Sequence, residues 1–118
     1  MHELSLAEDV IKIAESELKK NNALSVCEIT IEVGNMSGVE ADTFESALHI
    51  LSGGSCIEKS EIKVIKRKGK GICHKCGVEF EMEHRIDECP RCHSLPSEIR
   101  GGKEFRVISL VVETEDIN

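Results

Sequence analysis

Aromatic residues are scarce in this 118-residue chain, which contains no tryptophan, no tyrosine and only three phenylalanines. Its core must therefore be largely aliphatic, because isoleucine, valine and leucine are the large apolar residues that remain. The same scarcity removes the aromatic platforms on which the bases of single-stranded nucleic acid stack.

Long apolar segments are also missing. No run approaches the ~20 residues that a helix needs to cross a bilayer, so we expect no membrane partner. The first residues, Met-His-Glu-Leu-Ser, have neither the basic segment nor the apolar run of a secretory signal. We therefore expect a cytoplasmic protein whose thiols stay reduced.

Positive charge is in short supply, and the net charge is −7. The first 60 residues carry eleven acidic and four basic side chains, whereas residues 61–118 carry eleven of each. Affinity for nucleic acid is largely phosphate neutralisation, so we expect no nucleic-acid partner. We interpret the basic residues from Lys63 to Lys75 as a solvated strand face, with a phosphate-contacting patch as the alternative.

The cysteines, by contrast, occur at regular spacings. Four of the six cysteines form two Cys-x-x-Cys pairs, Cys73-His-Lys-Cys76 and Cys89-Pro-Arg-Cys92, with twelve residues between them. Each pair puts two sulfurs at one tight turn, and four thiolates make a tetrahedral cage that suits Zn²⁺. Because four protein ligands leave no position for water or substrate, we predict a structural zinc site and exclude a zinc-dependent enzyme.

Other interpretations of the paired cysteines have less support than a zinc site. Two disulfides conflict with a reducing compartment, and a redox Cys-x-x-Cys needs one pair that opens a helix after a strand. An iron–sulfur cluster stays the main alternative, since four cysteines also serve iron. His74 and His93 are interpreted as turn residues; the alternative hypothesis is that an imidazole replaces a thiolate as the pH falls.

Helical periodicity occurs twice. Apolar residues at helical spacing predict a helix over residues 5–21, and Ser5 with Glu8 forms a capping-box signature at its start. A second apolar stripe predicts a helix over residues 40–52, which Gly53-Gly54 ends.

Three segments have the composition of strands. Residues 26–33 alternate between apolar and polar side chains, and Cys27 falls in the apolar phase, so we predict that it is buried. A second strand is predicted over 61–68. A third is predicted over 104–113, where a nearly continuous apolar run is typical of a central strand.

Together these elements predict an α+β fold with a small mixed three-stranded sheet, two helices and an inserted zinc-ribbon-like lobe that carries the four paired cysteines. A strand–helix–strand order favours parallel pairing, and the third strand should return antiparallel after the cysteine-bearing excursion. We expect it to lie between the first two strands. Residues 1–69 and 103–118 should form an α/β domain, and residues 70–102 a zinc-binding domain.

The N-terminal residues Met1-His2-Glu3 suggest a second metal site. The terminal amine, the amide nitrogen of His2 and its imidazole can close chelate rings in one plane, which favours Ni(II) or Cu(II) over zinc. Binding expels an amide proton, so it should strengthen as the pH rises. The backbone of Glu3 and the carboxylate of Glu40 could add ligands, and the alternative is a plain exposed terminus.

Three segments of the sequence resemble one family. Met-His-Glu-Leu-Ser-Leu-Ala at the start, Val-Gly-Asn-Met-Ser-Gly-Val-Glu at 33–40, and the two cysteine pairs are similar to the HypA/HybF family of nickel-incorporation chaperones. The resemblance implies two lobes, with nickel at the N-terminal segment and structural zinc in the other. It implies His2, the Met1 amine and backbone nitrogen of Glu3 as nickel ligands, and Cys73, Cys76, Cys89 and Cys92 as zinc ligands.

The resemblance also implies a function and partners. It implies delivery of nickel as cargo during [NiFe]-hydrogenase maturation, through a nickel-binding GTPase and the hydrogenase large subunit, and in some bacteria supply to urease accessory proteins. We find no catalytic triad, phosphate loop or paired carboxylates, so we do not expect an enzyme. The alternative function is a zinc-ribbon nucleic-acid or transcription-associated module.

Overall fold

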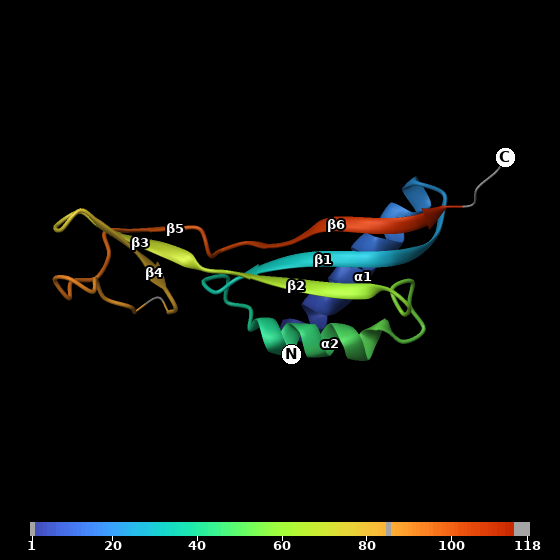
Figure 1. Ribbon diagram of the computed structural model, residues 1–118. Coiled ribbons are helices and arrows are strands. Elements are labelled where there is room, and N and C mark those ends of the chain that lie inside the picture. The colour runs from blue at the N-terminus through green and yellow to red at the C-terminus, as the bar shows by residue number, and fades with distance from the viewer. Residues whose placement is uncertain (1, 85, 115–118) are drawn as a thin grey trace.

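The computed structural model describes residues 2–84 and 86–114. Over these residues the strands make two three-stranded sheets, which lie end to end in an elongated molecule of 63 × 33 × 18 Å (Figure 1). The elements in chain order are α1 (His2–Lys20), β1 (Ala23–Gly34), α2 (Ala41–Ser52), β2 (Glu61–Arg67), β3 (Gly69–Cys73), β4 (Val78–Met82), β5 (Glu98–Arg100) and β6 (Phe105–Thr114). Within the described part of the chain, neither helix could span a bilayer.

The larger sheet has the order β2-β1-β6, with β1 parallel to β2 and antiparallel to β6. The α+β class and the mixed sheet are confirmed, but the predicted strand order is wrong, because β1 and not β6 lies in the middle. The apolar run of β6 misled the prediction, since part of it faces outward. Ile108 is 41% exposed and Val111 is 50% exposed.

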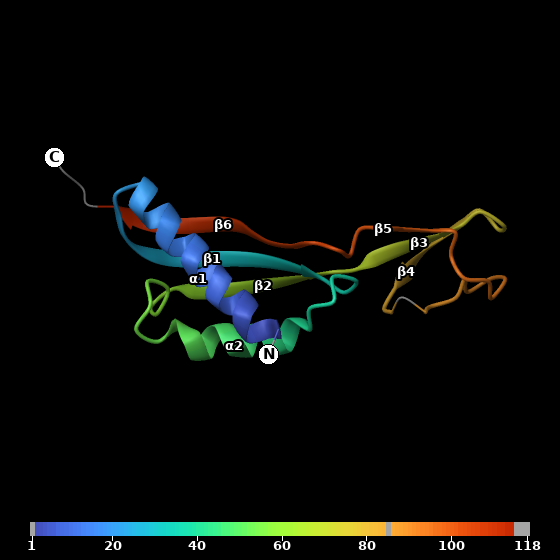
Figure 2. The same cartoon turned by 180° about the vertical axis from the view of Figure 1, so that it is seen from behind.

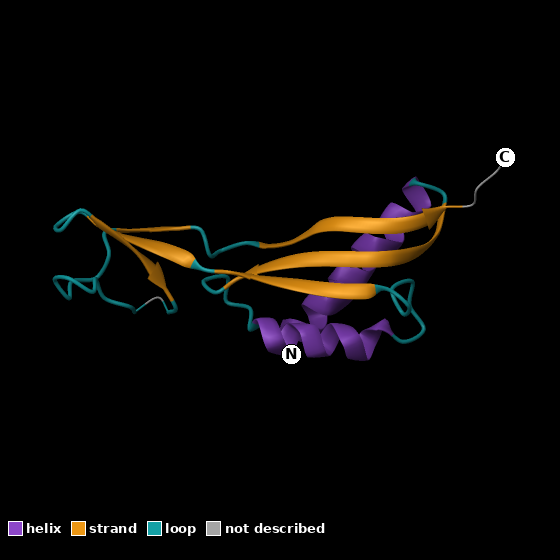
Figure 3. Ribbon diagram, viewed as in Figure 1, coloured by secondary structure: helices purple, strands orange, loops and turns teal. Residues whose placement is uncertain are grey.

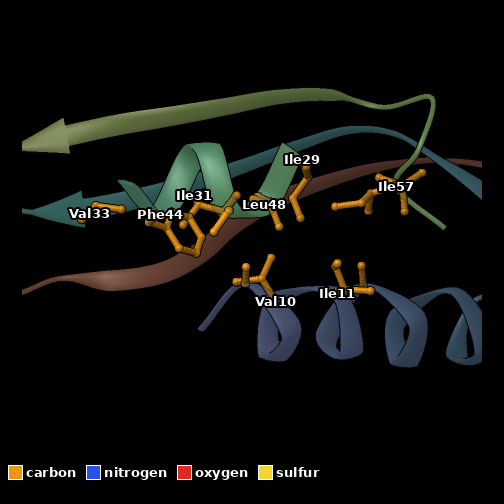
Figure 4. Close-up of a cluster of buried hydrophobic side chains, with 12 residues drawn as sticks. Val10, Ile11, Ile29, Ile31, Val33, Phe44, Leu48 and Ile57 are labelled. Atoms are coloured by element: carbon orange, nitrogen blue, oxygen red, sulfur yellow. The ribbon is translucent and has the colours of Figure 1, made fainter. Parts of the chain in front are cut away.

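Both helices pack against this sheet. α1 crosses β1 and β6, while α2 lies beside β2 and packs against α1 (Figure 2). The buried core between them is aliphatic apart from Phe44, whose ring meets the edge of Phe105 at 5.0 Å between centroids. Figure 4 shows the side chains that meet there, among them Val10, Ile11, Ile29, Ile31, Val33, Phe44, Leu48 and Ile57.

The central strand β1 contains a buried carboxylate, which is unusual for a strand in the middle of a sheet and is not expected from the sequence. Glu32 of β1 is only 4% exposed, and it accepts hydrogen bonds from Nε of Arg106 on β6 and, at 3.0 Å, from Nε of Arg67 on β2. The Arg106 and then the Arg67 hydrogen bonds lower the pKa of Glu32 below its ordinary value. The carboxylate is therefore charged and ties all three strands together across the face opposite the helices.

The helix starts differ from the predicted capping. α1 begins at His2, so Ser5 lies inside the helix and the predicted capping box is wrong. Glu3 in the first turn instead complements the positive end of the helix dipole. α2 begins after Glu40, whose side chain accepts from the Thr43 N–H, and Gly53 caps its end as predicted.

Cys27 is exposed, and the prediction that it is buried was wrong. The pairing of β1 with β6 shifts between Val26 and Glu28, which leaves Cys27 in a bulge without a partner on β6. The extra residue reverses the alternation, so Val26 and Ile29 face the core and Cys27 faces outward.

The two sheets meet where three backbone segments cross, namely residues 34–36, 67–69 and 101–104, which we call the junction. The N–H of Gly34 donates to the Glu104 carbonyl at 2.6 Å, and the N–H of Met36 donates to the Gly102 carbonyl at 2.6 Å. A Cβ on Gly102 would stand 2.6 Å from the Gly69 nitrogen, and Gly102 has a φ of +78°. Only glycine allows this approach without a shift of the backbone.

Gly34→Ala should therefore destabilise the protein. The added methyl would overlap the Gly102 carbonyl, so we expect a loss of about 3 kcal/mol in the free energy of unfolding. Urea unfolding of the zinc-loaded protein measures it. The matched control is Gly53→Ala, where a Cβ meets nothing within 4 Å, and which should change stability by less than about 1 kcal/mol. Equal effects of the two substitutions would contradict the crossing.

Candidate metal centre

The smaller sheet carries the two cysteine pairs on loops at its end remote from the helices (Figure 3). Cys73 ends β3 and Cys76 lies in the turn to β4, while Cys89 and Cys92 lie in the loop between β4 and β5. The four Sγ atoms of these cysteines all lie within 4.8 Å of one another. The structure thus brings together all four cysteines that the sequence singled out.

The spacing of the sulfurs fits a tetrahedral metal ion. The Sγ atoms of Cys73 and Cys92 are 3.6 Å apart. Sulfurs bound at ~2.3 Å to one tetrahedral zinc would be about 3.8 Å apart. Cys73 and Cys89 are buried and the other two are half-buried, and all four are free thiols. The donor set and its geometry are therefore those of a closed, structural metal centre.

Each cysteine pair is held by the same tight turn. The Gly77 N–H donates to the Cys73 carbonyl at 2.6 Å, and the His93 N–H donates to the Cys89 carbonyl at 2.9 Å. Gly77 and His93, each directly after the second cysteine of its pair, have φ values of +71° and +63°. The chain therefore makes two copies of one turn, with the less favourable residue for this conformation in the second copy.

The thiols differ in how readily they lose their protons. Hydrogen bonds from the side chain and backbone of Ser94 lower the pKa of Cys92 to about 6. The hydrogen bond with Cys92 in turn raises the pKa of Cys76 to about 12. Adjacent thiolates repel each other, so a cation is needed to hold all four in the charged form.

The neighbouring histidines face carboxylates. The Nε2 atom of His74 lies 3.9 Å from Glu98, and the Nδ1 atom of His93 lies 3.7 Å from Glu88. Both side chains are largely exposed, and neither belongs to the four-ligand cluster. Exchange of an imidazole into the metal shell at low pH stays a hypothesis.

The predicted nickel ligands lie at the other end of the molecule. His2 is exposed and forms the first turn of α1 together with Glu3, and Met1 lies outside the described residues. This end of α1 lies beside α2 (Figures 1 and 2). Among the described residues, His2 and Glu3 do not belong to any group of three or more side-chain ligands, so a metal here would need backbone donors.

Glu40 acts as a helix cap. Its Oε2 atom accepts from the backbone N–H and from the hydroxyl of Thr43, each at 2.6 Å. The Thr43 hydroxyl and then its N–H lower the pKa of Glu40 below the ordinary value. The cap lies in a notch at the start of α2, which Lys66 and, from the smaller sheet's side, Glu83 and His84 also line.

Asn35 joins the two sheets, and sequence reasoning missed it. Its Nδ2 atom donates to the Met82 carbonyl at the end of β4, at 2.7 Å, and its Oδ1 atom accepts from the Gly69 N–H at 3.1 Å. One side chain thus holds the smaller sheet at both β3 and β4. A Gly-Asn pair is typical of the end of a strand, and that pattern does not indicate which distant backbone groups the amide side chain contacts.

The fold and the metal centre together define a class of protein. A closed four-cysteine centre on a small sheet, attached to a two-helix α/β sheet, is the architecture of a small two-lobed metalloprotein. The family model described as hydrogenase/urease nickel incorporation, metallochaperone, hypA matches residues 1–112. The chain belongs to this family, as the resemblance in the sequence implied.

Relatives match over nearly their whole length. The hydrogenase maturation factor HypA of Parabacteroides distasonis is 38% identical over 115 residues, which is 98% of this chain and all of that protein. HypA of Aquifex aeolicus is 34% identical with the same coverage. The solution structure of the nickel metallochaperone HypA from Helicobacter pylori superposes with a TM-score of 0.64 at 25% identity, covering 96% of this chain and 98% of that one.

The metal centre predicts opposite outcomes for two cysteines. Cys89→Ser removes a buried ligand, so zinc content should fall well below one ion per chain, and the smaller sheet should lose its ordered structure. Cys27→Ser changes an exposed thiol on β1 and should leave zinc content unchanged. Elemental analysis and amide NMR spectra measure both. Full zinc occupancy in the Cys89 variant would contradict the assignment.

Asn35→Ala should loosen the two sheets relative to each other. The three hydrogen bonds that the side chain makes across the junction, with Met82, Glu83 and Gly69, are lost, while the metal ligands are untouched. Residual dipolar couplings should report a wider range of orientations between the sheets at unchanged zinc content. Asn35→Asp keeps the acceptor for the Gly69 N–H and should have a smaller effect. Couplings identical to wild type in the Ala variant would contradict this role.

Proposed function

We propose that this chain is a nickel metallochaperone that binds Ni(II) through Met1-His2-Glu3 and delivers it during maturation of [NiFe]-hydrogenase. The observation that supports a nickel site is the position of the first residue of α1. The first N–H groups of a helix have no intrahelical acceptor, so the amides of His2 and Glu3 can lose protons to a metal without breaking helical hydrogen bonds.

The proposed nickel shell consists of nitrogen atoms. The Met1 amine, the backbone nitrogen of His2 and the Nδ1 atom of His2 would supply three nitrogens in one plane, which suits Ni(II), and the backbone nitrogen of Glu3 is a further candidate donor. Such a set at an exposed helix start can be opened one ligand at a time, which suits transfer of the ion. Glu40 is not part of this proposed shell, since its carboxylate already caps α2.

The proposed role of zinc is structural. Cys73, Cys76, Cys89 and Cys92 would hold Zn²⁺ in a closed shell that stabilises the small lobe, which has few buried apolar residues of its own. We accordingly propose a nickel-binding domain of residues 1–69 and 103–118 and a zinc-binding domain of residues 70–102. No catalytic step is assigned to either domain, and we propose that the chain is not an enzyme.

The family role implies contact with the hydrogenase maturation machinery. We propose that the direct partners are a nickel-binding maturation GTPase and the hydrogenase large subunit, with urease accessory proteins as further candidates. We also propose that these contacts take place in the cytoplasm, where the thiols that hold zinc stay reduced.

A nucleic-acid-binding role is not favoured by the basic run between Lys63 and Lys75. Most of its cations are paired with carboxylates and are not free to neutralise phosphates. The pairs are Lys63 with Glu28 at 3.2 Å, Lys66 with Asp42 at 2.8 Å, Arg67 with Glu32 at 3.0 Å, Lys68 with Glu83 at 2.8 Å, and Lys70 with Glu79 at 3.4 Å.

Nickel titration tests the proposed site. His2→Ala, and separately acetylation of the Met1 amine, should each weaken nickel binding at least about tenfold, because each removes a nitrogen donor from the chelate. Binding to the wild type should strengthen as the pH rises, since the amides must lose protons. Isothermal calorimetry measures the affinities.

Zinc content and a second histidine variant serve as controls. Zinc should stay at one ion per chain in every variant, and His49→Ala, which alters an exposed imidazole on α2, should leave nickel affinity unchanged. Unaltered nickel affinity in both the His2→Ala variant and the acetylated protein would refute the proposed site.

A further inference from the structure

One face of the larger sheet is not covered by any helix or strand among the described residues, and we call it the open face. α1 and α2 both pack on the other side, so Figure 1 views the sheet from its open face and Figure 2 from its helix side. Ile65, Ile108 and Val111 do not belong to the core between helices and sheet, although a chain neighbour of each one does. Because side chains alternate along a strand, these three place apolar surface on the open face.

Two arginines share one carboxylate on the open face. The Oε2 atom of Glu32 accepts from Nε of Arg67 at 3.0 Å, and its Oε1 atom accepts from Nε of Arg106. Two positive charges thus meet one negative charge, and one positive charge is left uncompensated. Each guanidinium has four further N–H donors, and over the described part of the chain these have no acceptor. We call these three residues the arginine cluster.

The shared carboxylate holds both guanidiniums in position. Glu32 is almost fully buried, whereas the side chains of Arg67 and Arg106 are 48% and 69% exposed. Groups that are already held in place lose less conformational entropy when they bind. The planar guanidinium also matches the two oxygens of a carboxylate. The arginine cluster is therefore preorganised to bind a carboxylate of another molecule.

The charge of the open face changes along the strands. The arginine cluster lies at the end next to the junction, since it contains the last residue of β2 and the second residue of β6. Glu61 begins β2 and Glu113 lies near the end of β6, and neither makes an ion pair among the described residues. Lys63 and Glu28, which lie between, form a neutral pair at 3.2 Å. The face is thus positive at one end, apolar in its middle and negative at the other end.

The open face has the dimensions of one α-helix. Two spacings of ~4.8 Å between strands separate β2 from β6 by about 10 Å, which is close to the diameter of a helix. The seven residues of β2 extend over about 20 Å, the length of about 13 helical residues. A helix satisfies its own backbone groups, whereas a strand laid on the face would find the backbone of β1 already paired on both sides.

We propose that the open face binds an amphipathic helix of a partner protein, with a carboxylate at one end of the helix between the guanidiniums of Arg67 and Arg106. Apolar side chains of the helix pack on Ile65 and Val111, and a cation at its other end faces Glu61. This charge complementarity fixes the direction of the helix along the strands. None of the proposed metal ligands lies on this face, so the contact is separate from nickel and zinc binding.

The acidic end of the open face argues against nucleic acid as the occupant. A nucleic acid presents phosphates along its whole length and binds best to a continuous row of cations. Here Glu61 and Glu113 would repel its phosphates at one end. A protein helix can instead carry both signs of charge, in the order that the face requires.

A synthetic helix tests the proposal. The probe is an acetylated and amidated peptide of about 15 residues, with two glutamates near its start, leucines in its middle and two lysines near its end, all on one helical face. Added to the full-length, zinc-loaded protein, it should shift the NMR signals of the Nε–H groups of Arg67 and Arg106. A matched peptide with glutamines in place of the glutamates should bind at least about tenfold more weakly.

Three variants of the protein locate the binding surface. Arg106→Gln removes one guanidinium but keeps a donor for Glu32, and should weaken binding of the glutamate peptide at least about tenfold. Val111→Gln changes an exposed side chain and should weaken it about threefold. The matched control is Arg100→Gln, which removes a similarly exposed, carboxylate-paired arginine from the smaller sheet and should leave the affinity unchanged. Circular dichroism and zinc content confirm that each variant folds.

Four results would overturn the proposal. The first is equal affinity for the two peptides, and the second is an affinity that neither Arg106→Gln nor Val111→Gln changes. The third is a DNA duplex that binds the wild type and is lost in Arg106→Gln, because the occupant would then be a nucleic acid. The fourth is self-association that Val111→Gln abolishes in sedimentation equilibrium, because a second copy would then cover the face.

Discussion

The relative position of the two sheets depends on three backbone segments that cross at Gly34, Gly69 and Gly102. A Cβ on Gly34 would stand 2.0 Å from the Gly102 carbonyl oxygen and one on Gly102 would stand 2.6 Å from the Gly69 nitrogen, so main chain packs directly against main chain here, with hydrogen bonds between backbone groups. Asn35 adds two hydrogen bonds from one side chain to β3 and β4. The smaller sheet, with its four cysteines, is thereby held at a defined place relative to the start of α2.

Ligand chemistry is the basis for the different tasks that we propose for the two ends of the molecule. Four sulfurs within 4.8 Å of one another repel when charged and are satisfied by one soft, tetrahedral cation. That centre offers no open coordination position, which suits an ion that stays. In the proposed nickel site, backbone nitrogens and one imidazole at the start of α1 would offer a planar set instead, which suits an ion that is handed on.

The features that local sequence encodes were the ones predicted correctly. The clustering of the four paired cysteines follows from their spacing within two tight turns. Helix and strand positions were right to within a few residues, since they depend on periodicity. The start of α1 was misplaced because Ser5 and Glu8 match a capping motif that the fold does not use.

Features that depend on contacts between distant segments were not predictable in this way. The strand order failed because Glu32 looks solvent-facing until Arg67 and Arg106 are placed beside it from other strands. Cys27 was misassigned because a bulge, which depends on pairing with β6, reverses the alternation. The role of Asn35 depends on a carbonyl 47 residues away, and nothing near it in the sequence signals that contact.

The central claim is that nickel and zinc occupy separate, chemically distinct sites. X-ray absorption at the nickel and zinc K-edges, on protein loaded with one equivalent of each metal, tests it most directly. The account predicts a planar shell of nitrogen donors around nickel and four sulfurs around zinc. Sulfur in the nickel shell, or loss of sulfur from the zinc shell when nickel is added, would contradict it.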